Sequence, residues 1–255
     1  MMDINVYILT WCQQDENLYG TTLVFKTIRT GFPNAHIHVV DNASLLFARF
    51  RVQQLAKEND AKFTQLEREV PHHYFMEQIM YEQDKGIAVF VDPDICFWTN
   101  VENWNFSKLI AGRLIPKHRC EFSGCITHPR LHTSLLWIND MAALRDAIQT
   151  LQAQFFEFSP FRPFMWKSDN IWQRFDTAAS LYSALSSQTY KFTPKELDLY
   201  DHLFCGTHFN LVASQISPEY AFKYKEMHTK IKSDHLVLKG AWKIQDAYFR
   251  SLVID

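Results

Sequence analysis

Two aspartates, Asp92 and Asp94, end an apolar run in the sequence GIAVFVDPDICFW at residues 86–98. The run is rich in β-branched residues, which predicts a strand buried on both faces. Pro93 cannot donate to a strand ladder, so the strand should end there and present both carboxylates at its carboxyl end. Aspartates at positions i and i+2 of a turn can share one hard divalent cation, such as Mg²⁺ or Mn²⁺, which would bind a substrate diphosphate. The alternative is one aspartate that caps a helix beside one that is solvated.

This stretch resembles the metal-binding DxD motif of nucleotide-sugar glycosyltransferases with the GT-A fold, in which an apolar strand, Asp-x-Asp and more apolar residues follow one another. The resemblance implies an α/β, GT-A-like (Rossmann-like) fold with a mixed, mainly parallel central sheet flanked by helices. It also implies transfer of a sugar from a nucleotide-sugar donor, with UDP-sugars favoured. Mn²⁺ or Mg²⁺ would be the cofactor on Asp92 and Asp94, and Asp92 would also face the donor.

A second point of resemblance is the sequence VVDNAS at residues 39–44, where a second strand should end. Many GT-A enzymes end that strand in this way, with the aspartate on the base or ribose of the nucleotide. By this likeness Asp41 is a nucleotide contact, with Thr10 beside it at the end of the first strand. Arg49, on the next helix, is a candidate phosphate contact. The alternative is that Asp41 or Ser44 caps that helix, and both interpretations can hold.

The candidate catalytic acids lie in WKSDNIWQRFDTAASLY at residues 166–182. In GT-A enzymes an acidic residue on a helix after the metal motif often faces the acceptor or the anomeric carbon, and FDTAASLY is similar to a pattern in some of them. The resemblance makes Asp176 the first candidate and Asp169 the second. The alternative is that Asp169 caps a helix and Asp176 lies on its exposed face.

A late histidine followed by a glycine-containing turn supplies the third protein ligand to the metal in many GT-A chains. His202, with the Cys-Gly pair at residues 205–206, resembles that arrangement, and His208 is the alternative. Neutral imidazole is a reasonable ligand for Mn²⁺. The strictest family form continues into Lys-Pro-Trp, whereas this chain continues with THF at residues 207–209.

Cysteines and histidines gather in a second place, as His118, Cys120, Cys125, His128 and His132. Such a group can bind zinc, but the two cysteines stand too far apart for a standard finger. Structural zinc and ordinary packing are therefore both open. The five cysteines of the chain are odd in number and scattered, which favours reduced thiols over a disulfide framework.

Composition indicates an ordinary globular protein, because 47% of the 255 residues are hydrophobic and 21% are charged. One domain over residues 1–255 is expected, with a nucleotide-binding half at about 1–100 and an acceptor-binding half at about 101–255. No Walker or GxGxxG pattern is present. No apolar stretch is long enough to span a membrane, and the N-terminal residues enter a strand directly, which predicts a cytoplasmic protein.

The expected elements place the candidate residues at strand ends. A strand at 4–11, a helix at 20–29 and a strand at 35–40 form a βαβ unit with a parallel pair. The central strand and its two aspartates follow. The remaining expected elements are helices at 45–58, 71–83, 139–155 and 169–185, strands at 61–66, 109–115 and 133–138, and a surface loop at 158–166.

These features predict a hexosyl- or pentosyltransferase that acts on a glycan or small-molecule acceptor. A phage-type DNA-base glycosyltransferase needs cations along a groove, which the formal net charge of −2 disfavours. A DNA acceptor is still possible, because cations occur in the lysines at 223–243 and in Arg113, Lys117 and Arg119. The aromatic side chains of Trp166 or Phe161 could stack on a sugar or on an extruded base. A nucleotidyltransferase usually has a basic, glycine-rich loop after its first strand. This chain has the acidic, glycine-free sequence CQQDEN there, at residues 12–17, which disfavours that function. A non-catalytic nucleotide-sugar-binding module is disfavoured by the intact Asp-x-Asp.

Overall fold

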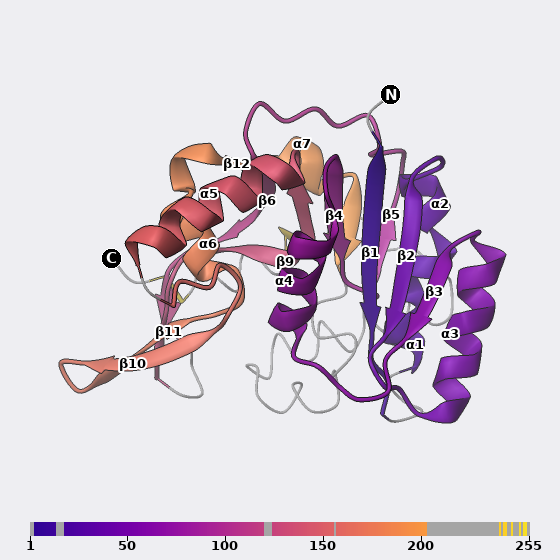
Figure 1. Cartoon of the computed structure of the whole chain (residues 1–255), viewed down its shortest axis with the longest axis horizontal. Coiled ribbons are helices and arrows are strands. Elements are labelled where there is room, and N and C mark those ends of the chain that lie inside the picture. The colour runs from indigo at the N-terminus through magenta and orange to yellow at the C-terminus, as the bar shows by residue number, and fades with distance from the viewer. Residues whose placement is uncertain are drawn as a thin grey trace.

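The computed structural model describes residues 3–13, 18–119, 124–155 and 157–202, together with residues 240, 242, 243, 246, 250, 252 and 253. Its strands form a seven-stranded sheet, a four-stranded sheet and a two-stranded ribbon (Figure 1). The strands are β1 Ile4–Thr10, β2 His36–Asp41, β3 Lys62–Gln65, β4 Ile87–Val91, β5 Ile95–Phe97, β6 Ile110–Ile115, β7 His118–Arg119, β8 Ile126–Thr127, β9 Arg130–Ile138, β10 Phe164–Ser168, β11 Ile171–Phe175, β12 Thr189–Lys191 and β13 Tyr200–His202.

The seven-stranded sheet has the strand order β12-β6-β9-β4-β1-β2-β3. Neighbouring strands are parallel except at β9, which is antiparallel to both β4 and β6. The predicted mixed, mainly parallel α/β sheet is therefore confirmed. β4 lies in the middle of the sheet, so the carboxyl ends of β1, β2 and β4 meet at one edge (Figure 1).

Helices cover both faces of this sheet. α4 and α5 pack on one face, and α2 and α3 pack on the other (Figure 1). In the described part of the chain, none of the helices is long and apolar enough to cross a membrane. The helical elements are α1 Leu18–Thr22, the 3₁₀ turn η2 Leu23–Lys26, α2 Ile28–Gly31, α3 Leu46–Glu58, α4 His72–Glu82, α5 Met141–Gln154, α6 Ala179–Ala184, the 3₁₀ turn η3 Ser186–Gln188 and α7 Pro194–Leu197.

β4 is buried on both faces, as its sequence predicts. Ile87, Val89 and Val91 point into the core that contains α3. Ala88 and Phe90 point into the core that contains α4 and α5. Successive side chains of a strand point to opposite faces, so only a continuous apolar run can fill both cores at once. The residues after Val91 therefore leave the sheet from a fixed position.

The helix predicted over residues 169–185 is wrong over its first half, and the surface loop predicted at 158–166 ends earlier than expected. Residues 164–175 form a β-hairpin of β10 and β11, and helix α6 begins only at Ala179. Asp169 and Asn170 both have positive φ, of 49° and 64°. A two-residue turn with φ > 0 at both positions is the hairpin turn that Asp and Asn tolerate best. This local turn outweighs the helical spacing of the apolar residues.

The helix predicted over residues 20–29 is divided into α1, η2 and α2. The division falls at Thr27, whose hydroxyl accepts a hydrogen bond from the Phe97 N–H of β5 at 3.0 Å. Threonine readily bonds backbone groups in this way, which competes with a continuous helix. The interruption between η2 and α2 thus ties this part of the chain to β5, the strand that follows Asp94.

Gly31 allows α2 to approach β5 closely. A Cβ atom at Gly31 would lie 2.5 Å from the Cγ atom of Phe97, whose side chain is 1% exposed and has no room to move. We expect Gly31→Ala to lower the free energy of unfolding by about 1–3 kcal/mol, because the buried contact is overpacked. Urea unfolding measures this loss. Thr30→Ala, at an exposed position of the same helix, is the control and should change stability by less than about 0.5 kcal/mol; equal effects would contradict the prediction.

Candidate metal centre

Asp92 and Asp94 project from a turn whose backbone is held on both sides. The Asp92 N–H donates to the Ser134 carbonyl of β9 at 2.8 Å. The Pro93 carbonyl accepts from the Val24 N–H of η2, also at 2.8 Å. Main-chain bonds to two different elements leave the turn little freedom, so the positions of both carboxylates are set by the sheet.

His202 completes a group of possible metal ligands. It ends β13, which pairs antiparallel with β5 so that His202 lies opposite Ile95, the residue after Asp94. His202 Nε2 lies 3.1 Å from Asp94 Oδ1 and 3.7 Å from Asp92 Oδ2. The three ligand atoms lie within 4.8 Å of one another, and no other such group of His, Cys, Asp or Glu occurs in the described residues. His208, the alternative late histidine, lies outside them.

Burial and mutual charge determine the protonation of this group. The side chain of Asp94 is 4% exposed and that of Asp92 is 26% exposed. Desolvation raises the pKa of Asp92, with a further contribution from the Asp94 carboxylate, against the opposing charges of His72 and His202. Burial disfavours the charged form of His202, but the ion pairs with Asp94 and Asp92 outweigh it, so the pKa of His202 is raised. The two carboxylates thus stabilise positive charge at this position.

His132 packs against the ring of His202. The sequence pattern pointed to His132 only as a possible zinc ligand. The two ring centroids are 4.9 Å apart, and His132 Nδ1 accepts the Ser134 N–H at 3.1 Å. Desolvation, together with the charges of His202 and Arg130, holds the pKa of His132 well below its usual range. A neutral ring therefore packs against the ligand. The position of His132 follows from strand order. His132 lies near the start of β9, and because β9 runs antiparallel to β4, the start of β9 lies beside the carboxyl end of β4.

The alternative zinc site does not assemble among the described residues. His118 Nδ1 lies 2.9 Å from a backbone carbonyl oxygen, and His128 Nε2 lies 3.0 Å from the side-chain oxygen of Gln173. Cys125 is buried, and Cys120 lies outside the described residues. The histidines of this segment thus make separate polar contacts.

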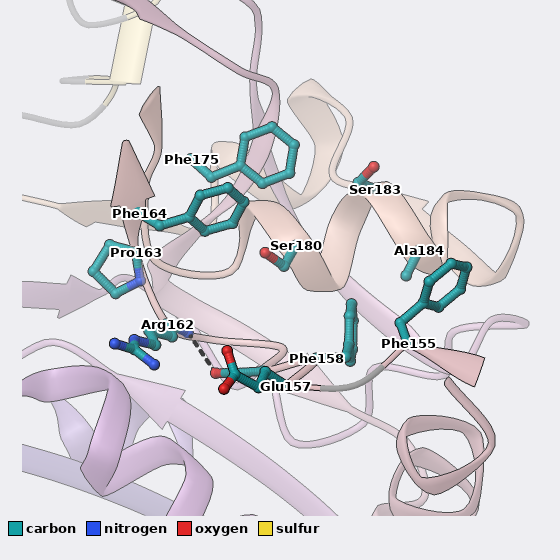
Figure 2. A pocket seen from close by; sticks show the side chains of 11 residues that line it. Phe155, Glu157, Phe158, Arg162, Pro163, Phe164, Phe175, Ser180, Ser183 and Ala184 are labelled. Carbon is teal, nitrogen blue, oxygen red and sulfur yellow. Dashed lines mark hydrogen bonds between the residues drawn. The ribbon is translucent and has the colours of Figure 1, made fainter. Parts of the chain in front are cut away.

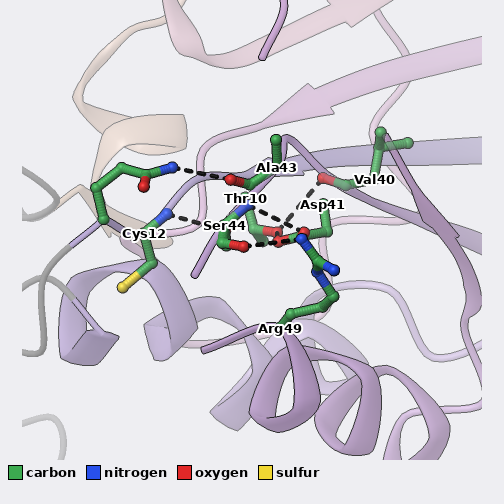
Figure 3. Close-up of polar contacts among 8 residues, drawn as sticks. Thr10, Cys12, Val40, Asp41, Ala43, Ser44 and Arg49 are labelled. Carbon is green, nitrogen blue, oxygen red and sulfur yellow. Dashed lines mark hydrogen bonds and ion pairs between the residues drawn. The ribbon is translucent and has the colours of Figure 1, made fainter. Parts of the chain in front are cut away.

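Asp41 ends β2 with its side chain fully buried. Its Oδ1 accepts from the Thr10 hydroxyl at 3.4 Å, and its Oδ2 accepts from the Ser44 N–H at 3.2 Å and lies 3.5 Å from Arg49 Nε (Figure 3). Arg49 also donates to the Ser44 carbonyl at 3.0 Å. Neither Asp41 nor Ser44 is the N-cap of α3, which is Leu45. The carboxylate instead shapes the loop between β2 and α3.

Asn42 links this loop to the segment before α4. Its position next to Asp41 is the only sign of this role in the sequence. Its side-chain nitrogen donates to the Val70 carbonyl at 2.9 Å, and its side-chain oxygen accepts the Val70 N–H at 2.8 Å. This two-bond contact fixes the segment that enters α4 at His72. The charge of His72 opposes the rise in the pKa of Asp92, so the loop after β2 also helps to place a residue that acts electrostatically on Asp92.

Asp176 and Asp169 lie on the β10–β11 side of the molecule, and neither belongs to the metal-ligand group. Asp176 follows β11 and pairs with Arg130 at 3.0 Å and Arg174 at 3.1 Å. Burial opposes its ionisation, but the two arginines outweigh it and hold the pKa of Asp176 below its usual range. Asp169 is exposed in the turn of the hairpin.

The cations that could have served an anionic acceptor are only partly described. The lysines from 223 to 239 and the Cys-Gly pair at 205–206 lie outside the described residues. Arg113 is buried and pairs with Asp246, while Lys243 Nζ lies 3.6 Å from Asp198 Oδ1. These two cations are thus engaged within the chain.

No protein-family model and no curated protein matches the sequence. Solved structures of several glycosyltransferases show a partial likeness. Mannosyltransferase PcManGT from Pyrobaculum calidifontis, in complex with GDP-Man and Mn²⁺, is 16% identical over 59% of this chain and 48% of that chain, with a TM-score of 0.40. The WbbM bifunctional glycosyltransferase is 13% identical over 76% of this chain and 39% of that chain, with a TM-score of 0.46. Galactosyltransferase LgtC, in complex with donor and acceptor sugar analogues, is 11% identical over 73% of this chain and 72% of that chain, with a TM-score of 0.41.

This chain covers less than half the length of the first four solved structures that it matches. At identities of 16% or less and TM-scores below 0.5, these likenesses assign neither a substrate nor an activity to it.

Metal binding tests the ligand group directly. We expect the chain to bind Mn²⁺, and Asp94→Asn to weaken that binding at least about tenfold, because it removes a charged oxygen ligand from a buried site. Titration of Mn²⁺ followed by electron paramagnetic resonance reports the free ion. Asp84→Asn is the control, since Asp84 is exposed and precedes the opposite end of β4. Equal affinity in both variants would contradict the assignment.

The pairing of Asp176 with two arginines predicts an acid-sensitive contribution to stability. Because the folded-state pKa of Asp176 is below its ordinary value, this contribution is present above about pH 4 and is lost as the pH falls through the folded-state pKa. We expect Asp176→Asn to lower the free energy of unfolding at neutral pH by about 1–3 kcal/mol, since Arg130 stays recessed without its charged partner. Urea unfolding at neutral and acidic pH should show the difference between variant and wild type shrinking with acidity; a constant difference would refute the prediction.

Proposed function

We propose that this protein is a metal-dependent glycosyltransferase that moves a sugar from a nucleotide-sugar donor to an acceptor hydroxyl. The observation that carries the proposal is the convergence of Asp92, Asp94 and His202 at the carboxyl end of the central strand. Open α/β sheets bind ligands at the carboxyl ends of their strands. An Asp-x-Asp pair with a histidine at that edge supports binding of a diphosphate through a divalent cation.

The donor set fits Mn²⁺ or Mg²⁺. Two carboxylate oxygens suit either hard cation, and the imidazole nitrogen favours Mn²⁺, because Mg²⁺ takes oxygen ligands almost without exception. The two carboxylates that raise the pKa of His202 would attract a metal cation in the same way, and the imidazole would bind that cation after losing its proton. When bound, such a cation stabilises the negative charge that develops on a nucleoside diphosphate leaving group.

Asp92, Asp94 and His202 would hold the cation, and Asp92, the more exposed carboxylate, would also face the donor. Arg49 is our candidate phosphate or ribose contact, because its side chain is 26% exposed although Asp41 holds it. Thr10 and Asp41 would act through the loop that they fix, since both side chains are fully buried. These assignments concern the nucleotide side of the proposed site.

In the proposed reaction the acceptor oxygen forms a new bond to the anomeric carbon, the bond from that carbon to the diphosphate breaks, and the hydroxyl proton is released. Of the two candidate acids we favour Asp176, because its side chain is recessed and its arginine partners keep it ionised. An ionised carboxylate can accept a proton or orient a hydroxyl. Asp169 is the second candidate, and its exposed turn offers no such environment.

The test is hydrolysis and transfer with UDP- and GDP-sugars, with product identity as the readout. We expect Mn²⁺-dependent release of a nucleoside diphosphate, abolished by a chelator and reduced by at least about a hundredfold in Asp92→Ala and Asp94→Ala, because charge stabilisation of the leaving group is lost. Asp84→Asn should retain full activity. A nucleoside triphosphate formed from nucleotide sugar and pyrophosphate would instead identify a nucleotidyltransferase. Binding without turnover would identify a binding module.

A further inference from the structure

A groove of about 540 Å³ lies between the β10–β11 hairpin, helix α6 and the segment after α5 (Figure 2). Four phenylalanines line it, with a glutamate, an arginine and serines between them. Pockets for small ligands fall in this size range and combine apolar walls with a few polar groups. The groove is lined by Phe155, Glu157, Phe158, Ser159, Arg162, Pro163, Phe164, Phe175, Ser180, Ser183 and Ala184.

The aromatic rings form two opposing walls. Phe164 and Phe175 lie on one side of the groove, and Phe155 and Phe158 lie on the other (Figure 2). The first wall is held in place by stacking, because the Phe164 and Phe175 centroids are 5.0 Å apart and Trp166 lies 5.5 and 5.2 Å from them. Phe155 is 60% exposed and Phe164 is 47% exposed. Rigid, solvent-facing rings on both sides suit a flat ligand with apolar faces.

The polar groups of the groove match hydroxyls better than phosphates. Glu157 and Arg162 are the only charged residues that line it, and their formal charges cancel. Ser180 points from α6 into the space between the aromatic walls (Figure 2). A nucleic acid needs several cations to neutralise its phosphates, whereas an uncharged ligand with many hydroxyls needs both donors and acceptors. Together, ring faces and paired donors and acceptors are the recognition chemistry of a neutral saccharide.

The segment that borders the groove at residues 159–161 contacts helix α4 and the central strand. Ser159 donates a hydrogen bond to Glu77 of α4, and Phe161 packs its ring 6.3 Å from that of Phe90 on β4, two residues before Asp92. On the other side, Asp176 directly follows the lining residue Phe175 and pairs with Arg130, the first residue of β9. These contacts join the segments around the groove to β4, whose end leads into Asp92, and to β9, which accepts the Asp92 N–H.

We infer that this groove binds a neutral saccharide as the acceptor, with the sugar ring between the two phenylalanine walls. The role of the saccharide as acceptor rests on the proposed glycosyltransferase function. Saccharide binding in the groove does not depend on turnover. Phe164 and Phe175 are specificity-determining contacts, and Glu157, Arg162 and Ser180 hold the hydroxyls. The lining carries no net formal charge, so it offers no net attraction to an anionic polymer.

The experiment measures saccharide binding by the metal-free full chain, using ligand-observed NMR with lactose, cellobiose and maltose as probes. We expect wild type to bind at least one of them with millimolar or tighter affinity. Ser183→Trp places a large side chain in the groove from an exposed helical position, so it should retain the fold and weaken binding at least about tenfold. Phe164→Ala should weaken binding by a similar factor, because a stacking ring is lost.

Trp172→Ala is the matched control. Trp172 lies on the same hairpin and is 50% exposed, but it pairs with Lys167 and does not line the groove. It should bind the probes as wild type does. Absence of binding by wild type, or equal binding by wild type and Ser183→Trp, overturns the inference. Tighter binding of a duplex DNA oligonucleotide than of all three disaccharides, lost in Ser183→Trp, also overturns it.

Activity separates this inference from the proposed function. Ser183→Trp should lose transfer to the bound disaccharide while it retains Mn²⁺-dependent hydrolysis of the donor, and Asp94→Ala should show the reverse pattern, with saccharide binding intact. If wild type hydrolyses no nucleotide sugar yet loses saccharide binding in Ser183→Trp, the proposed function fails and the saccharide site stands.

Discussion

The structure depends on placing two carboxylates at the end of a strand that is buried on both faces. Asp94 is almost fully buried and lies two residues from Asp92, so the pair requires a positive partner. His202 lies against both carboxylates, and β13 is held in place by pairing with β5 and by the hydrogen bond from Trp98 to Asp201 at 2.8 Å. The short two-stranded ribbon thus brings His202 to the carboxylates that follow the central strand.

A second consequence is that the loops at this edge are joined to one another by polar contacts. Asp41 holds the loop after β2, and the Asn42 N–H donates to the Thr10 carbonyl at the end of β1. The Asn42 side chain in turn holds the segment before α4. Buried hydrogen-bonded networks of this kind are rigid when every member is satisfied. They join the loops after β1 and β2 and the segment before α4 into one rim at the carboxyl-end edge of the sheet.

The β10–β11 hairpin gives the molecule a second, different surface beside this rim. It belongs to the four-stranded sheet β10-β11-β8-β7, and its aromatic stack extends to His128 in the loop between β8 and β9. The metal centre is charged and recessed, whereas the groove is aromatic and carries no net charge. Asp176 directly follows Phe175 of the groove and is paired with Arg130, the first residue of β9. A charged donor side and a neutral acceptor side would be served by these separate environments.

The sequence by itself determined the parts that follow from local patterns. The apolar run before Asp92, the alternation in β2 and the Pro93 break predicted the strands and the edge where Asp92 and Asp94 lie, because burial on one or two faces leaves a direct mark on residue type. The late histidine was proposed from resemblance, and the structure brings it to the two aspartates.

Only the tertiary structure decided the rest. The hairpin at residues 164–175 was hidden because its turn conformation outweighs an apparent helical spacing. His132 and Asn42 gained their roles from strand order and loop packing, which a single sequence does not contain. Contacts such as His202 with Asp94 join residues far apart in the chain, and their formation depends on which strands become neighbours in the folded sheet.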